Sequence, residues 1–324
     1  MKNSKINDFI KIGITGQNGF IGSHLINNLL LFPKEFEIIN FNRSFFKNDK
    51  SLDEFVLKCD VIIHLAALNR HDDPDEIFRT NISLVQCLIN SLSRTKSRTH
   101  VILASSTQEG LDNPYGLSKK KGREILLKWA NSTNNKFTGL IIPNVFGPFG
   151  NPFYNSVVAT FCHQISNRQK PKINEDSILK LIYINDLVKK IIEIVRNYEA
   201  KDLYIIDHSH TLKVSDLLKL IKSFYERYEL NGEIPYLKSK FELDLFNTYR
   251  CHMNINDYFP VNFIKHNDKR GSFFEMIRFS DGGQVSFSTT EPGYVRGNHF
   301  HTRKIERFAV IKGKALIQLR RIGS

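Results

Sequence analysis

Residues 11–25 read KIGITGQNGFIGSHL, and the rest of the chain is organised around them. An apolar run with Ile12 and Ile14 leads into the glycine-rich turn TGQNGFIG, after which Leu25 continues a helix-like apolar pattern. A strand, a glycine-rich turn and a helix in this order predict a dinucleotide-binding site. A glycine-rich turn that binds no ligand is the alternative, and the matching segments on both sides favour the nucleotide.

The three glycines of this turn have separate physical roles. Gly16 lets the chain turn tightly after the strand, Gly19 lets the backbone approach a pyrophosphate, and Gly22 lets the helix pack closely on the sheet. The phosphates would lie at the helix N-terminus, where free N–H groups and the helix dipole favour an anion. The residues expected to contact the cofactor here are Gly16, Asn18, Gly19, Phe20, Ile21 and Gly22.

The composition of the 324-residue chain limits the classes of function. A hydrophobic content of 41% supports one large domain or two smaller ones. The net charge of +13 favours anionic partners, but the basic residues are scattered and no nucleic-acid-binding module is recognisable, so we expect no nucleic-acid partner. No signal peptide or membrane span is recognisable, and the four cysteines lack metal or redox spacing. These features predict a cytoplasmic protein without membrane contact.

The end of the second predicted strand bears on the choice of cofactor. Residues 37–41, EIINF, read as a strand that ends at Asn42 and Arg43. A site for NAD(H) usually places a carboxylate here to hold the ribose hydroxyls, whereas an arginine suits a 2′-phosphate. We therefore expect Asn42 and Arg43 to contact the cofactor and NADP(H) to be preferred. A surface arginine without cofactor contact is the alternative.

Residues 60–67, DVIIHLAA, read as a buried parallel strand that ends in small residues. Small side chains would let a cofactor lie against the backbone at Leu65, Ala66 and Ala67. His64 lies inside the apolar strand, where a histidine is more often packed than catalytic. Strands and helices alternate along this part of the chain and predict a Rossmann-type, doubly wound parallel sheet with ligands at the carboxyl ends of the strands.

A candidate catalytic group follows the next strand, residues 100–104. Tyr115 and Lys119 stand four residues apart and share one face of a predicted helix. An ammonium beside a phenol would lower the pKa of the phenol from its ordinary value of about 10. A hydroxyl from the strand end at Ser106 could hold a substrate oxygen beside the phenol. Together these groups predict proton transfer in a carbonyl–alcohol interconversion, with a nicotinamide carrying the hydride.

These motifs together resemble the extended short-chain dehydrogenase/reductase superfamily. The matching segments are TGQNGFIG (Thr15–Gly22), HLAA (His64–Ala67), ASST (Ala104–Thr107), YGLSK (Tyr115–Lys119), PNVFGP (Pro143–Pro148) and YINDL (Tyr183–Leu187). The resemblance implies that Tyr115 is the catalytic acid/base, that Lys119 lowers its pKa and contacts the ribose, and that Ser106 polarises the substrate. It also implies a cofactor contact at Pro143 and substrate contacts at Asn144 and at Thr107, which is the alternative hydroxyl to Ser106.

The chain departs from the sugar epimerases of this superfamily in two places. The gap between Ser106 and Tyr115 is much shorter than in 4-epimerases of the UDP-galactose type, which disfavours that activity. The arginine often found ahead of the PNVFGP-like segment is replaced by Ile141 and Ile142. A 4,6-dehydratase would need an acid beside the strand-end hydroxyl, and Gln108 stands there instead.

A second motif lies near the end of the chain. His299 and His301 alternate on a predicted strand, so both imidazoles leave the same face, and Glu306 follows within reach. Two imidazoles and a carboxylate suit Zn, Fe, Mn or Ni. The spacing of these residues between Gly293 and Gly313 matches the first cupin motif. We therefore expect a reductase domain with a small substrate lobe over residues 1–254 and the N-terminal part of an all-β cupin barrel over residues 255–324.

A reductase followed by a cupin resembles the bifunctional capsular-polysaccharide enzymes of UDP-N-acetyl-L-fucosamine synthesis, the CapF type. The resemblance implies a homodimer whose cupin epimerises C3 of a UDP-4-keto-6-deoxy-hexosamine and whose reductase domain reduces C4 with NADPH. No second cupin motif follows Gly313, so we expect C4 reduction with little C3 epimerisation. A 4-epimerase or 4,6-dehydratase, and a nucleotide-binding redox sensor or scaffold, are the alternatives.

Overall fold

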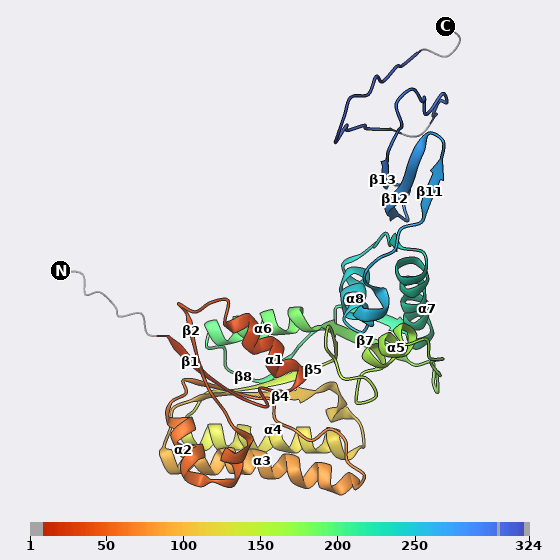
Figure 1. Ribbon diagram of the computed structural model, residues 1–324. Helices are drawn as coiled ribbons and strands as arrows, with labels where there is room; N and C mark the ends of the chain where they lie inside the picture. The colour runs from red at the N-terminus through yellow and green to blue at the C-terminus, as the bar shows by residue number, and fades with distance from the viewer. Residues whose placement is uncertain (1–8, 303–304, 321–324) are drawn as a thin grey trace, which may run out of the picture. The chain divides into compact units, whose positions relative to one another are not determined.

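The structure, a computed structural model, describes residues 9–302 and 305–320. Its largest feature is a six-stranded sheet of order β2-β1-β3-β4-β5-β8 (Figure 1). All neighbouring strands run parallel, and the predicted Rossmann-type fold is confirmed. The strands are β1 (Ile10–Thr15), β2 (Phe36–Ile39), β3 (Val61–His64), β4 (His100–Ser106), β5 (Phe137–Ile142) and β8 (Lys201–Ile205).

Helices cover both faces of this sheet, with α1 and α6 on one side and α2, α3 and α4 on the other (Figure 1). The helices are α1 (Phe20–Leu29), α2 (Asp49–Leu57), α3 (Pro74–Thr95), α4 (Pro114–Thr133) and α6 (Ile184–Arg196). Short 3₁₀ helices are η1 (Arg43–Lys47) and η2 (Thr107–Gly110). Ile102 of β4 belongs to the core on one face of the sheet, whereas Val101 and Leu103 belong to the core on the other. Burial on both faces explains the near-continuous apolar strands of the sequence.

A smaller lobe is built around the three-stranded sheet β6-β7-β9. Its strands are β6 (Asn144–Phe146), β7 (Ile178–Tyr183) and β9 (His210–Lys213), and its helices include α5 (Val157–Ser166), α7 (Val214–Phe224), α8 (Lys240–Arg250) and α9 (Ile255–Tyr258). A π-helical turn, η3 (Tyr225–Leu230), follows α7. Apolar side chains such as Phe161, Leu217 and Leu245 are buried in this lobe and belong to the same core as one face of the large sheet.

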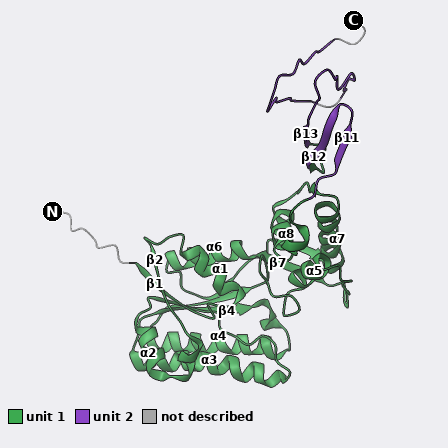
Figure 2. Cartoon of the chain, viewed as in Figure 1, with its two compact units in different colours: residues 1–261, 278–283 green, residues 262–277, 284–324 purple. Residues whose placement is uncertain are grey.

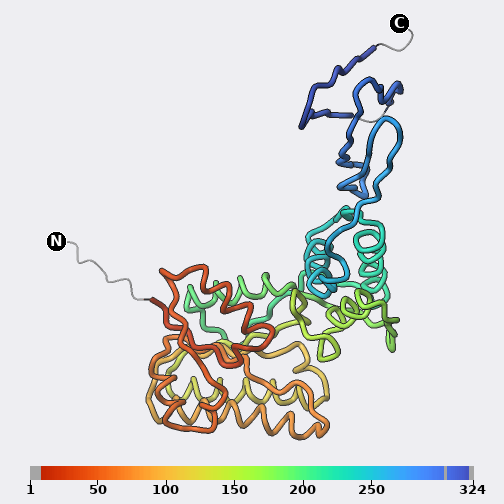
Figure 3. Tube along the Cα trace, in the orientation of Figure 1, coloured from red at the N-terminus to blue at the C-terminus, as the bar shows by residue number. Residues whose placement is uncertain are grey.

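The chain passes between the large sheet and the smaller lobe more than once (Figure 3). It leaves the large sheet after β5, forms β6, α5 and β7, and returns with α6 and β8 to the sheet edge. It then enters the lobe again with β9, α7 and α8. Residues from both sides of this crossing meet at the carboxyl ends of the parallel strands, where open α/β sheets bind their ligands.

The chain divides into two compact units, residues 1–261 with 278–283 and residues 262–277 with 284–324 (Figure 2). The second unit contains an antiparallel pairing of β11 (Lys265–Asp268) with β12 (Gly271–Phe279), and β13 (Gln284–Ser288) also pairs with β12. The end of β12, which lies in the first unit, pairs with β10 (Glu233–Ile234). None of the described residues of the second unit is fully buried, in agreement with the expected incomplete β segment.

The expected domain boundary at residue 254 and the assignment of the second unit to a cupin stay predictions. Residues 321–324, the end of the expected cupin segment, and residues 1–8, the part of the chain to which the expectation of no signal peptide refers, lie outside the described residues. Within the part of the chain that the structure describes, no helix is both long and apolar enough to cross a bilayer.

Candidate active site

A cavity of about 560 Å³ opens at the carboxyl ends of β1, β3, β4 and β5, and the smaller lobe closes its other side. Its lining brings together segments that are far apart in the sequence. They are Gly16, Gly19–Gly22, Leu65–Ala67, Asn69, Ala104–Ser106, Gln108, Tyr115, Lys119, Ile142–Val145, Gly147, Gly150, Asn151 and Tyr154–Ser156. Most of the residues predicted from the sequence therefore share one cavity, although their roles as ligands of cofactor and substrate stay predictions.

The glycine-rich turn forms one wall of the cavity. Gly16 has a φ of +79°, and a Cβ atom there would lie 2.8 Å from the backbone nitrogen of Ala66. A Cβ atom on Gly22 would collide with the carbonyl oxygen of Gly16. Only glycine fits either position, so the turn comes close to the end of β3 as the fingerprint requires. Asn18 is exposed and is not part of the cavity lining.

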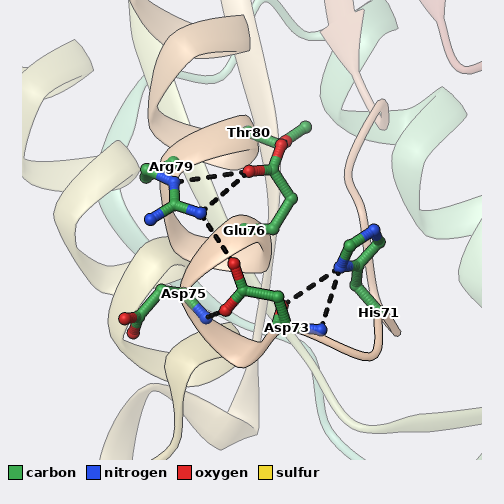
Figure 4. A network of polar contacts seen from close by, with 6 residues as sticks. All are labelled: His71, Asp73, Asp75, Glu76, Arg79 and Thr80. Atoms are coloured by element: carbon green, nitrogen blue, oxygen red, sulfur yellow. Dashed lines mark hydrogen bonds and ion pairs between the residues drawn. The ribbon is translucent and has the colours of Figure 1, made fainter.

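The loop that follows β3 is tied down at both ends. Asn81 of α3 accepts a hydrogen bond from the Leu68 amide at 2.6 Å and donates to the Leu68 carbonyl at 3.0 Å and to Ser118 Oγ at 2.9 Å. At the start of α3, Asp73 accepts from the Asp75 amide and pairs with Arg79 at 2.8 Å (Figure 4). These contacts hold Leu65, Ala66, Ala67 and Asn69 against the cavity.

His64 is buried and does not line the cavity. Its Nδ1 lies 2.8 Å from Thr15 Oγ1, and burial lowers the pKa of His64 to about 3, with the charge of Lys119 adding to the effect. The imidazole is therefore neutral at pH 7 and joins β1 to β3 by a hydrogen bond. The structure thus gives this histidine the packed position that the apolar strand indicates.

Ser106, Tyr115 and Lys119 line the same cavity. Lys119 is buried. Its Nζ donates to the carbonyl oxygen of Ala104 at 2.8 Å and lies 5.6 Å from the centre of the Tyr115 ring. Asn113 begins α4 by accepting a hydrogen bond from the Gly116 amide at 2.8 Å. The helix start is thereby fixed one turn before Lys119, and Tyr115 and Lys119 come from the same helix face.

The protonation of the tyrosine–lysine pair differs from the sequence-based expectation. Burial raises the pKa of Tyr115 to about 12, with a contribution from the nearby Tyr154, and burial lowers the pKa of Lys119 to about 8. The expectation that Lys119 lowers the pKa of the phenol is not met, because burial raises the pKa of Tyr115 and the ammonium of Lys119 donates to Ala104. At pH 7 the phenol is protonated and the amine is still mostly charged.

Besides Asn18, three of the predicted cofactor and substrate contacts lie outside the cavity lining. Asn42 and Arg43 are exposed at the start of η1, where Asn42 Oδ1 accepts hydrogen bonds from the amide and the hydroxyl of Ser44, both at 2.9 Å. Gln17 Oε1 accepts from the Phe41 amide at 3.3 Å and so joins the glycine-rich turn to this segment. Thr107 is exposed, so of the two predicted hydroxyls only Ser106 belongs to the cavity lining.

Sequence reasoning missed several polar residues of the lining. They are Asn69, Ser105, Asn151 and Tyr154. The loop that carries Tyr154 is held across the cavity by Arg70, whose Nη1 donates to the Phe153 carbonyl at 2.9 Å. Asn69 and Arg70 follow the predicted segment Leu65–Ala67 after one intervening residue, and that position was the available signal. Asn151 and Tyr154 reach the cavity only through the path of the loop, for which no local pattern exists.

The predicted metal ligands lie close together in the second unit. The ligand atoms of His299, His301 and Glu306 lie within 4.8 Å of one another. Nε2 of His301 is 3.1 Å from Nε2 of His299 and 3.2 Å from Oε1 of Glu306. Among the described residues, no fourth histidine, cysteine or carboxylate joins this group. A metal-binding role for the three residues stays a prediction.

Comparisons with known proteins agree with this geometry. Residues 12–206 match the NAD dependent epimerase/dehydratase family, and residues 266–324 match the polysaccharide biosynthesis C-terminal domain. A reductase of Pseudomonas aeruginosa, UDP-2-acetamido-2,6-beta-L-arabino-hexul-4-ose reductase, is 32% identical over 97% of this chain and 83% of its own. Dihydroflavonol 4-reductase of Callistephus chinensis is 23% identical over 67% of this chain and 73% of its own. The crystal structure of the capsular polysaccharide assembling protein CapF of Staphylococcus aureus matches 90% of this chain and 78% of its own, with a TM-score of 0.77 and 30% identity.

Proposed function

Because the chain belongs to the NAD dependent epimerase/dehydratase family, as an NAD(P)-dependent oxidoreductase of the extended short-chain type, we propose that it reduces the C4 ketone of a UDP-4-keto-6-deoxy-hexosamine with NADPH. The observation that carries the proposal is the meeting of Ser106, Tyr115 and Lys119 beside the glycine-rich turn in one cavity. The likeness to a named UDP-hexulose reductase along nearly the whole chain supports the substrate class. The product would serve as a precursor of a capsule or surface polysaccharide.

The cavity fits a nicotinamide dinucleotide at the glycine-rich turn. Gly16 and Gly22 carry no Cβ atom, and this lets the backbone pack closely at both positions. Gly19 precedes α1 and offers no side-chain hydrogen bond to the helix start. The pyrophosphate would lie at this helix start. Leu65–Ala67 and Pro143 would hold the rest of the cofactor, and Arg43 would face the 2′-phosphate of NADPH. The bound cofactor supplies a hydride to the carbonyl carbon.

The protonation of Tyr115 suits reduction. A reduction needs an acid that donates a proton to the developing alkoxide, and a phenol with a pKa of about 12 keeps its proton at pH 7. Ser106 would donate a hydrogen bond to the substrate oxygen and hold it beside Tyr115. Lys119 places a positive charge behind the phenol and favours the phenolate that proton transfer leaves. The phenolate then regains a proton from solvent.

The surroundings of Ser106 disfavour elimination on the same scaffold. The carboxylate nearest in sequence, Glu109, is held by the hydroxyl of Ser105 and by Arg123, whose Nη2 lies 2.8 Å from Glu109 Oε2. It is not part of the cavity lining, whereas the neutral amide of Gln108 is. A 4,6-dehydratase would need a free acid or base beside the sugar. Reduction therefore fits the residues better.

The second unit would add a metal site of modest strength. His299, His301 and Glu306 form a donor set that suits a divalent transition metal, which would act there as a Lewis acid on a bound sugar. All three residues are exposed, so solvent competes for the ion. We propose that metal binding is weak and that C3 epimerisation is correspondingly slow.

The test is turnover of a UDP-4-keto-6-deoxy-hexosamine with NADPH, followed by mass spectrometry of the sugar. The expected result is one NADPH oxidised per alcohol formed, with Tyr115→Phe losing about 10²–10⁴-fold in rate while it still binds the cofactor. A change of configuration at C4 without net consumption of NADPH would instead show an epimerase, and near-normal turnover by Tyr115→Phe would refute the assigned acid.

A further inference from the structure

A partly buried ion pair joins the end of β4 to α4, the helix of the proposed catalytic residues. The side chains of Glu109 and Arg123 are only 11% and 16% exposed, and Arg123 donates to the carboxylate from Nε at 3.0 Å and from Nη2 at 2.8 Å. Arg123 follows Lys119 by one helical turn on α4, so it continues the helix face of Tyr115 and Lys119. A two-point pair that is largely shielded from solvent is stronger than a fully exposed pair.

The end of β4 is joined to its surroundings at three successive residues. The carbonyl of Ala104 accepts from Lys119 at 2.8 Å, the hydroxyl of Ser105 donates to Glu109, and the hydroxyl of Ser106 accepts from the Gln108 amide at 3.2 Å. Glu109 thus links the strand that carries Ser106 to the helix that carries Tyr115.

The backbone around the pair is shaped to hold it. A Cβ atom on Gly139 of β5 would lie 2.6 Å from Cδ of Arg123, so only glycine leaves room for the arginine stem. A Cβ atom on Gly116 would collide with the carbonyl oxygen of Gln108, so η2 packs directly on the first turn of α4. This close packing is what allows the short connection between Ser106 and Tyr115.

We propose that Glu109 is a positioning residue for the reduction, which, paired with Arg123, holds the Ser106 end of β4 against the Tyr115–Lys119 face of α4. The proposal rests on the proposed function for its effect on turnover. Glu109 does not contact the cavity and acts only through the residues that do.

The same carboxylate acts on the charge of Lys119. The charged or titratable groups around Lys119 are His64 from β3, Tyr115 from its own helix and Glu109 from η2. His64 and Tyr115 are neutral at pH 7, with pKa values of about 3 and about 12. The negative charge of Glu109 raises the pKa of Lys119 against the effect of burial, so its loss should let the ammonium deprotonate at lower pH.

The chain offers a matched control for this device. Asp53 of α2 accepts hydrogen bonds from the hydroxyl of Ser91 at 2.6 Å and from Nε and Nη2 of Arg94 at 3.0 and 2.9 Å. As at Glu109, the carboxylate accepts a hydrogen bond from a serine hydroxyl and further hydrogen bonds from two nitrogens of one arginine. None of these three residues lines the cavity. Replacing Asp53 therefore shows what the loss of such an ion pair does when the site is left intact.

The experiment compares wild type with E109Q, E109Q/R123M and R123K, and with D53N as control. For each folded variant, the affinity for NADPH is measured by fluorescence from pH 6 to pH 10, a readout that needs no sugar. The reduction rate is measured at pH 6.5, where Lys119 is charged in every variant. We expect wild-type cofactor binding to weaken around pH 8, the pKa of Lys119.

For E109Q we expect this midpoint to fall by roughly one pH unit and the rate at pH 6.5 to fall about tenfold, an effect of about 1.4 kcal/mol. In E109Q/R123M the midpoint should recover part of its shift, because the unpaired guanidinium is gone, while the rate stays low. R123K should keep the midpoint and lose part of the rate.

An unchanged midpoint and rate in E109Q, or equal losses in D53N, would overturn the proposal. Absence of sugar reduction by wild type would refute the proposed function instead, and the cofactor titration would still decide the role of Glu109.

Discussion

At the scale of single residues, the chemistry of the site depends on which charges are buried. Lys119 keeps its ammonium inside the protein with one hydrogen bond, to the Ala104 carbonyl at 2.8 Å. A Lys119 with its pKa lowered from 10.5 to about 8 destabilises the folded state by on the order of 3 kcal/mol at neutral pH. A substitution that removes the charge of Lys119 would relieve this penalty, but it would also remove the hydrogen bond to Ala104, which costs about 1 kcal/mol of stability.

Lys119→Met should therefore stabilise the protein by about 2 kcal/mol at pH 7 while it abolishes reduction. The unfolded chain binds the proton more tightly than the folded chain, so the penalty is complete below pH 8 and fades between pH 8 and pH 10.5. The melting temperatures of the two proteins should accordingly differ at pH 7 and converge by pH 10. A variant that melts below wild type at pH 7 would show that Lys119 stabilises the fold.

A second single residue, Arg43, should decide the choice of cofactor. Arg43 is exposed at the start of η1, where a 2′-phosphate would gain a charge-assisted contact. We expect NADPH to bind at least tenfold more tightly than NADH, and Arg43→Ala to reduce this ratio severalfold by weakening NADPH alone. Titration of both dinucleotides measures the ratio, and Lys58→Ala is a control at an exposed residue after α2. Equal affinities in wild type would contradict the assignment.

At the scale of the elements, α3 holds in place the loop after β3, which we propose binds the cofactor. Asn81 is 5% exposed and makes three hydrogen bonds, two to the backbone of Leu68 and one to Ser118. The start of the helix at Asp73 fixes the other end of the same loop (Figure 4). Ser118 precedes Lys119, so one asparagine joins the loop after β3 to the helix of the proposed catalytic residues.

Asn81→Ala should cost about 2–3 kcal/mol of stability, because it removes the side-chain partners of two partly buried backbone groups of Leu68. It should also weaken NADPH binding severalfold, since Leu65–Ala67 lose their support. Denaturant unfolding and cofactor titration measure the two effects. Asn90→Ala, on the exposed face of the same helix, should change both by little. Similar losses in the two variants would assign the effect to helix propensity.

At the scale of the whole molecule, the sequence predicts what is local and misses what the fold brings together. The glycine-rich turn and the spacing of Tyr115 and Lys119 are local patterns, and the structure places all of them in one cavity. The pair Glu109–Arg123 and the approach of Tyr154 depend on how separate segments meet, which no local pattern records. The same is true of the phenol pKa, because burial is set by tertiary packing.

The second unit should contribute little to catalysis. None of its described residues is fully buried, and its three candidate ligands are exposed. We expect Zn²⁺ to bind in the micromolar range or weaker and C3 of the keto-sugar to exchange with D₂O no faster than without protein. Clear exchange at C3 that is lost in His299→Ala would contradict this, and His266→Ala, an exposed histidine of β11, is the control.

The central claim is that Tyr115 and a nicotinamide reduce a sugar ketone, and isotope transfer tests it most directly. With NADPH deuterated at the transferable position of C4 of its ring and a UDP-4-keto-6-deoxy-hexosamine, the account predicts one deuterium at C4 of the product sugar. Label transfer should fall about 10²–10⁴-fold in Tyr115→Phe, although the variant still binds NADPH. Product that carries no deuterium at C4, or undiminished label transfer by the variant, would contradict the account.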